Sequence, residues 1–127
     1  MHYIENYDGP KYDVVIMDIV DSTESKEVAK LYTVEFYTKI KNIVMNENSV
    51  FITQSSALHL LNHNCSSRIR KTAEAVFGNA VLYGTFHISF REYWSFVIYV
   101  PNKNLKELKL GVGVDMEIKK REMEENL

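Results

Sequence analysis

The segment YDVVIMDIVDS, residues 12–22, decides the fold of this chain. Its first half is short, apolar and β-branched without alternation, which is typical of a strand that is buried in a parallel sheet. The apolar run stops at Asp18, and a second carboxylate, Asp21, follows in the same segment. In an open α/β sheet, ligands bind just beyond the carboxyl ends of the strands. The segment therefore predicts a strand over residues 12–18 that brings two acids to such a place, where they can hold an amine and accept its proton.

A helix and a second strand are predicted after this segment. Residues 33–45 carry apolar side chains at helical spacing, and Thr33 is a suitable N-cap. The polar run at 46–48 is expected to close this helix. A second short buried strand is expected over residues 49–53, and it ends on the polar side chain of Gln54.

The remaining pattern completes the order β-α-β-α-β-β. Ser66 is a candidate cap for a helix that ends at Gly78. Residues 80–88 and 93–100 are rich in β-branched and aromatic side chains, and a short turn separates them, so they are expected to pair antiparallel. The two βα units before them predict parallel strands with right-handed crossovers. Residues 19–32 have no clear period and are expected to form a loop with some helix.

Length and composition describe one globular domain, with 127 residues of which 46% are hydrophobic and 25% charged. The net charge of −2 gives no electrostatic reason to expect nucleic acid as a partner. No apolar run approaches the roughly 20 residues that span a membrane. The polar start is unlike a signal peptide, and the one cysteine, Cys65, suits a reducing compartment. We therefore expect a cytoplasmic protein with a core over residues 12–100 and a charged helical tail over 115–127.

Four segments resemble the polyamine aminopropyltransferases, the spermidine synthase family, and its archaeal branch most. The family has an apolar strand followed by Asp-x-x-Asp-Pro, and Asp18 and Asp21 stand at both acid positions, with Ser22 at the position of the Pro. The resemblance implies a Rossmann-like, S-adenosylmethionine-methyltransferase-like half-domain of α/β class. Family members begin with a small β domain and a Gly-rich nucleoside-binding element, so residues 1–127 are interpreted as one truncated catalytic region. The segments are YDVVIMDIVDS, LYTVEFY (31–37), VFITQS (50–55) and ISFREYWSFVI (88–98).

The resemblance also implies an activity and roles for five side chains. Family members transfer an aminopropyl group from decarboxylated S-adenosylmethionine, a co-substrate and not a tightly bound cofactor, to a polyamine. Asp18 would be the catalytic base, and Asp21 would hold the amino group of the donor. Gln54 is a candidate to hydrogen-bond an amine beside Asp18, and Phe90 and Trp94 are candidates to line a slot for the methylene chain. The alternatives are a turn or cap role for the acids and core packing for the two rings.

Other functions and partners remain open from the sequence. The chain is expected to be weak or inactive alone, and the alternatives are a non-catalytic remnant that acts by association or a fragment of an S-adenosylmethionine-dependent methyltransferase. The first strand would have a bare outer edge, so a second copy of the chain or a missing N-terminal half is the expected partner. His59, His63 and Cys65 have a spacing that would suit zinc on a helix, but they fall in a predicted loop without a fourth ligand, so no metal is expected.

Overall fold

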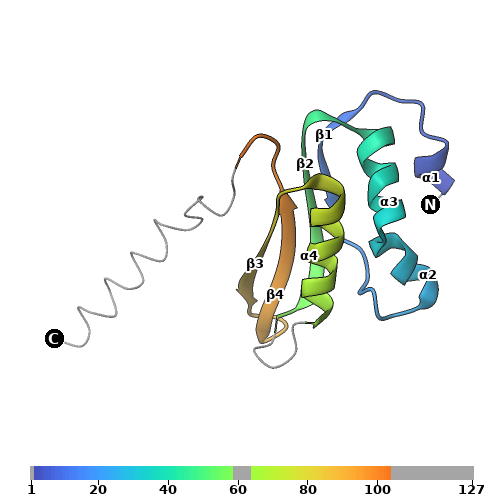
Figure 1. Ribbon diagram of the computed structural model, residues 1–127. Helices are drawn as coiled ribbons and strands as arrows, with labels where there is room; N and C mark the ends of the chain where they lie inside the picture. Colours follow the sequence, from blue (N-terminus) through green and yellow to red (C-terminus); the bar gives the residue numbers. More distant parts are fainter. Residues whose placement is uncertain (1, 59–63, 104–127) are drawn as a thin grey trace.

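The computed structural model describes residues 2–58 and 64–103 (Figure 1). The strands are β1 (Tyr12–Met17), β2 (Met45–Ala57), β3 (Ala80–His87) and β4 (Glu92–Tyr99). The helices are α1 (His2–Glu5), α2 (Lys26–Ala29), α3 (Val34–Lys39) and α4 (Asn64–Phe77), with a 3₁₀ turn η1 (Lys30–Tyr32) and a π-helical turn η2 (Ile40–Val44). The predicted tail over 115–127 lies outside the described residues.

The four strands form one sheet in the order β1-β2-β4-β3. β1 and β2 run parallel, and β4 lies between β2 and β3 and is antiparallel to both. In Figure 1, α3 and α4 lie on the same face of this sheet. The predicted α/β class is confirmed, with one parallel pair and an antiparallel C-terminal pair.

The helical segment after the acid-bearing loop begins where the sequence predicts. The Thr33 hydroxyl accepts a hydrogen bond from the backbone N–H of Phe36 at 3.3 Å, which satisfies one of the free donors of the first turn. α3 continues directly into η2, and the apolar positions Phe36, Ile40 and Val44 are all buried. The predicted period therefore identifies the face that packs on the sheet.

The second strand is longer than the sequence predicts. β2 begins at Met45, so the polar run at 46–48 belongs to the strand and does not close the helix. At the other end, β2 continues past Gln54 to Ala57. The register of pairing with β4 shifts between Gln54 and Ala57, and Ser56 has a φ of 77°. The strand therefore continues through a β-bulge at this point. The predicted end at Gln54 is wrong because a bulge has no signal in the hydrophobic pattern.

The cap predicted for the next helix is also wrong. α4 already includes Ser66, whose hydroxyl is buried and donates to the backbone oxygen of Ser55 at 2.9 Å. Tertiary contact with β2 therefore takes the hydroxyl that a cap would use. The predicted end is confirmed, because Gly78 has a φ of +89° and its N–H bonds the oxygen of Glu74 at 2.9 Å.

Aromatic rings connect the helices to the sheet in the core. Phe51 of β2 is fully buried, and its ring centroid lies 5.1 Å from Tyr37 of α3 and 4.7 Å from Phe77 of α4. Phe77 stacks in turn on Tyr99 of β4 at 5.0 Å. Ring pairs at these distances add to the hydrophobic stabilisation from burial. This column holds β2 and β4 against the helices.

Candidate active site

The two acids lie where the sequence predicts, at the carboxyl end of β1. Met17, the last residue of β1, pairs with Thr53 of β2 in the parallel register. Asp18 and Gln54 are therefore the next residues on two neighbouring strands. Asp18 is exposed and Asp21 is half-buried in the loop that follows. The loop between β1 and α2, residues 18–25, is called the acid loop below.

Gln54 ties the acid loop to the sheet. Its side chain is 3% exposed, and its Nε2 lies 2.7 Å from the backbone oxygen of Ile19 and 3.1 Å from the Asp21 Oδ1. Its Oε1 accepts a hydrogen bond from the backbone N–H of Ser56 at 2.9 Å. The amide oxygen therefore faces the β2 bulge, while the amide nitrogen faces the acid loop.

Tyr32 is a second anchor of the acid loop, and the sequence analysis did not single it out. Its hydroxyl donates to the backbone oxygen of Val20 at 3.0 Å and accepts from Gln54 Nε2 at 2.9 Å. The only sequence signal for this role is its position in the LYTVEFY segment. Gln54 and Tyr32 together hold two successive carbonyls and one carboxylate of the loop.

Burial and nearby negative charge keep the Tyr32 phenol protonated. Burial is the largest cause that raises the pKa of Tyr32, to about 12, and the hydrogen bond from Gln54 opposes it. The charges of Asp21, Cys65 and Asp18 raise this pKa further. The structure joins Asp21 to Gln54 by a hydrogen bond, and Asp18 directly follows the strand next to the one that carries Gln54. Tyr32 is therefore a hydrogen-bond donor near neutral pH and not a base.

A hollow of about 580 Å³ lies on the helix side of the acid loop. Within the described chain its lining includes Ser22 and Tyr32 but none of Asp18, Asp21 and Gln54. The Ser22 hydroxyl and the Cys65 thiol are 3.2 Å apart, so the loop is also tied to the start of α4. The full lining is Ser22, Thr23, Ala29, Tyr32, Asn64, Cys65, Arg68, Ile69 and Thr72.

Phe90 and Trp94 form an aromatic pair at the same end of the sheet. Their ring centroids are 5.1 Å apart, and Phe90 also stacks on His87 at 4.7 Å. Trp94 of β4 pairs in register with Ala57, beyond the bulge, so the pair lies on the rim that β2 shares with the acids. Phe90 is 53% exposed, which is unlike a core side chain.

Metal binding and membrane insertion have no support in the described residues. Within residues 2–58 and 64–103, no three His, Cys, Asp or Glu side chains gather as a metal-binding group. His59 and His63 lie outside these ranges, so the interpretation of their spacing stays a prediction. Every described helix is too short or too polar to cross a bilayer.

Comparison with known proteins identifies one group of relatives. Residues 1–109 match the family described as the spermine/spermidine synthase domain. A polyamine aminopropyltransferase of Aeropyrum pernix is 35% identical over 104 residues, which cover 81% of this chain and 32% of that protein. Polyamine aminopropyltransferase 2 of Hyperthermus butylicus is 35% identical over 95 residues, covering 75% of this chain and 30% of that protein. This chain therefore spans about a third of the length of these relatives.

Solved structures agree with the fold. Spermidine synthase in complex with the transition-state analogue AdoDATO superposes with a TM-score of 0.66 at 20% identity, covering 85% of this chain and 36% of that one. Spermidine synthase from Thermotoga maritima superposes with a TM-score of 0.62 at 21% identity, covering 85% and 35%. The β1-β2-β4-β3 sheet with its helices is thus a piece of the fold that these structures share.

Proposed function

We propose that this chain, which belongs to the spermine/spermidine synthase domain family, forms the amine-binding rim of a polyamine aminopropyltransferase. The reaction is the transfer of an aminopropyl group from decarboxylated S-adenosylmethionine to a polyamine. The observation that carries the proposal is the acid loop at the carboxyl end of β1, where the Asp21 carboxylate is held 3.1 Å from the Gln54 amide nitrogen and Asp18 remains exposed. Carboxylates at this edge of an open sheet are placed for a ligand.

Asp18 is the general base in this proposal. An alkyl ammonium has a pKa of about 10, so an amine must lose a proton before or while it attacks. The amine nitrogen forms a bond to the carbon next to the sulfonium, the carbon–sulfur bond breaks, and its electron pair leaves on a neutral thioether. The proton passes from the amine to the Asp18 carboxylate. Because Asp18 is exposed at the end of β1, an amine can reach it.

Asp21 binds the donor's ammonium group in this proposal. A carboxylate offers about four acceptor positions, and the Gln54 contact uses one of them. A charge-assisted hydrogen bond from an ammonium suits the rest. The anchored loop holds this carboxylate in place before the substrate arrives, which limits the entropy lost on binding.

The aromatic pair binds the methylene chain between the two charged ends of a polyamine. Phe90 offers a half-exposed ring face, and Trp94 supports it at 5.1 Å. An apolar wall on the rim that also carries the exposed Asp18 carboxylate fits a diamine or triamine better than a single ammonium ion. The free thiol of Cys65, beside the acid loop, suits a reducing compartment such as the cytoplasm.

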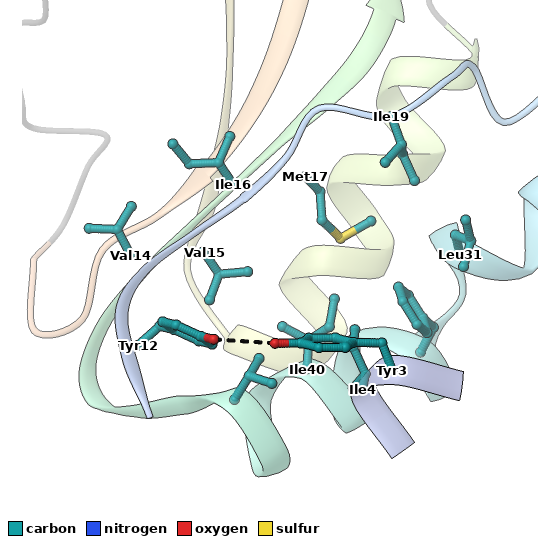
Figure 2. A pocket seen from close by; sticks show the side chains of 12 residues that line it. Tyr3, Ile4, Tyr12, Val14, Val15, Ile16, Met17, Ile19, Leu31 and Ile40 are labelled. Atoms are coloured by element: carbon teal, nitrogen blue, oxygen red, sulfur yellow. Dashed lines mark hydrogen bonds between the residues drawn. The ribbon is translucent and has the colours of Figure 1, made fainter. Parts of the chain in front are cut away.

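The outer side of β1 is the contact for the rest of the domain. β1 is an edge strand, and Val14 and Ile16 are 52% and 66% exposed. An apolar groove of about 520 Å³ runs beneath it, and in Figure 2 the side chains of Val15 and Met17 point into this groove while Val14 and Ile16 lie on the other side of the strand. Parallel strands are normally covered on both faces and both edges. Since the chain spans about a third of its relatives, we assign this surface to the part of the family fold that the matched region does not include.

Binding of spermidine to the 127-residue chain, followed by nitrogen–proton NMR, tests the amine site. Shifts should centre on Asp18 and the acid loop beside it, and Asp18→Asn should weaken spermidine binding about tenfold, since it removes a charged hydrogen-bond acceptor. Asp21→Asn should weaken by a similar factor the binding of decarboxylated S-adenosylmethionine, whose ammonium group Asp21 holds in this proposal. Asp13→Asn is the matched control, because Asp13 is an exposed acid on the same strand and accepts from Asn46 at the opposite end. Shifts spread over the surface, with Asp13→Asn weakening spermidine binding as much as Asp18→Asn, would overturn the site.

The base role needs a complete enzyme. A chimaera that joins the upstream part of the Aeropyrum pernix relative to this chain should transfer aminopropyl groups, and Asp18→Asn in it should lower kcat by about 10²–10⁴-fold. Turnover within a few fold of the parent chimaera would remove Asp18 from the base role. A chimaera that folds but binds no donor would favour the non-catalytic association function.

A further inference from the structure

Three buried serines from three elements meet behind the acid loop. Ser55 of β2, Ser66 of α4 and Ser95 of β4 are all 0% exposed. The Ser95 Oγ lies 2.8 Å from the Ser55 Oγ and 3.0 Å from the Ser66 Oγ. Buried hydroxyls destabilise a fold unless they are hydrogen-bonded, so this cluster depends on its partners. We call it the serine cluster.

The serine cluster supplies partners for the carbonyls of the β2 bulge. A bulge interrupts the hydrogen-bond ladder, so its backbone groups need other partners. The Ser66 hydroxyl donates to the Ser55 oxygen at 2.9 Å, and the Ser95 hydroxyl donates to the Ser56 oxygen at 2.7 Å. Each hydroxyl has one proton, so the Ser55 hydroxyl is left to donate to Ser95. One arrangement of protons therefore satisfies both bulge carbonyls.

The bulge in turn decides which way the Gln54 amide faces. Ser56 lies in the left-handed region with a φ of 77°, and in this conformation its N–H points back to the Gln54 Oε1 at 2.9 Å. With the amide oxygen bound there, the amide nitrogen is directed at Ile19 and Asp21. The Ser56 N–H belongs to the Ser55–Ser56 peptide, whose carbonyl accepts from Ser66, while Ser95 holds the carbonyl of the next peptide. If Ser56 left its left-handed conformation, the Gln54 amide would lose the bond that orients it.

We propose that Ser95 is a positioning residue for the Asp21 carboxylate. By holding the carbonyl on the far side of Ser56, it keeps Ser56 in the left-handed conformation that directs the Ser56 N–H at the Gln54 amide. Ser95 lies on β4, two strands away from β1 in the sheet order, so its effect on Asp21 passes through other residues. Its consequence for amine binding rests on the proposed function, whereas its control of the Gln54 amide is a property of the fold alone. The serine cluster thus couples the antiparallel half of the sheet to the site on the parallel half.

Hydrogen exchange of the Gln54 side-chain amide tests this coupling in the 127-residue chain. In Ser95→Ala the exchange of these protons with water should become about tenfold faster, the factor that corresponds to one net hydrogen bond. Ser49→Ala is the matched control, because Ser49 is also 0% exposed on β2 and its hydroxyl donates to the Tyr12 oxygen at 2.6 Å, at the opposite end of the strand. The control should leave the Gln54 exchange unchanged. Equal acceleration in both variants would overturn the proposal, since it would report general loosening.

Affinity for decarboxylated S-adenosylmethionine, whose ammonium group Asp21 holds in the proposed function, gives the functional readout. Ser95→Ala should weaken this binding about fivefold through the loss of a fixed Asp21, and Ser49→Ala should not. If the parent chain does not bind this donor but the exchange difference is present, the proposed function fails and the positioning role stands. Should Ser95→Ala not fold, Ser95→Cys keeps a side chain of similar size with a weaker donor and should give intermediate exchange. Exchange in Ser95→Cys equal to that of the parent chain would count against the role of Ser95.

Discussion

Replacing Gln54 with leucine should unfold the acid loop and destabilise the whole domain. The side chain is 3% exposed, so leucine fills a similar buried space but forms none of the hydrogen bonds. The Ser56 N–H and the Ile19 oxygen then lose their partners, while the Tyr32 hydroxyl keeps the Val20 oxygen. A buried backbone group without a partner costs roughly 1–3 kcal/mol, so the free energy of unfolding should fall by about 2–6 kcal/mol.

Urea unfolding followed by circular dichroism measures this loss. With a slope of about 1–3 kcal/mol per molar urea, the midpoint should fall by about 2 M. Thr53→Val is the matched control, because Thr53 is the adjacent buried residue of β2 and its hydroxyl donates to the Gln54 backbone oxygen. The urea midpoint of this control should fall much less than that of Gln54→Leu. A midpoint for Gln54→Leu within about 0.5 M of the parent chain would refute the idea that Gln54 anchors the loop.

A charged replacement separates the two ends of the amide. Gln54→Glu keeps an acceptor for the Ser56 N–H but sets a second carboxylate against Asp21 and the Ile19 oxygen. Burial and like charge raise the pKa of such a carboxyl above its usual value of about 4.3. The variant should therefore be most stable at acidic pH and lose stability as pH rises through that raised pKa. If stability changed with pH as it does in the parent chain, the carboxylate at position 54 would not interact with the acid loop.

Three further outcomes follow from the structure. Tyr37→Phe should leave the free energy of unfolding unchanged or raise it by about 1 kcal/mol, since the buried Tyr37 hydroxyl has no hydrogen-bond partner in the described chain; a fall of that size in urea unfolding would contradict this. Tyr32, with a pKa raised to about 12, holds its proton more tightly in the folded state, so stability should fall as pH rises from about 10 to 12. Tyr32→Phe should flatten that fall, and an unchanged slope would show that Tyr32 is not its source. The chain alone should self-associate through the bare edge of β1, and Ile16→Lys should make it monomeric in size-exclusion chromatography with light scattering; a monomeric parent chain would rule out that contact.

The sequence predicts the elements whose signals are local. The apolar run before Asp18, the period of residues 33–45 with its Thr33 cap, the stop at Gly78 and the hairpin of the last two strands all appear where expected. Each depends on a period or on the conformation of one residue, and such preferences act within a few positions of the chain. The sequence also places both acids at the end of the first strand, because the apolar pattern stops there.

Only the tertiary structure shows what holds the acids in place. The order of the strands places Gln54 beside Asp18, and the β2 bulge orients the Gln54 amide. Tyr32 and Ser95 come from segments whose local sequence patterns do not predict a role in the site. A hydrogen bond between residues 33 positions apart, such as that from Gln54 to Asp21, depends on which strands are neighbours and on their register. The hydrophobic pattern predicts which side of an element is buried, but it does not predict the hydrogen-bond partner of a buried polar group.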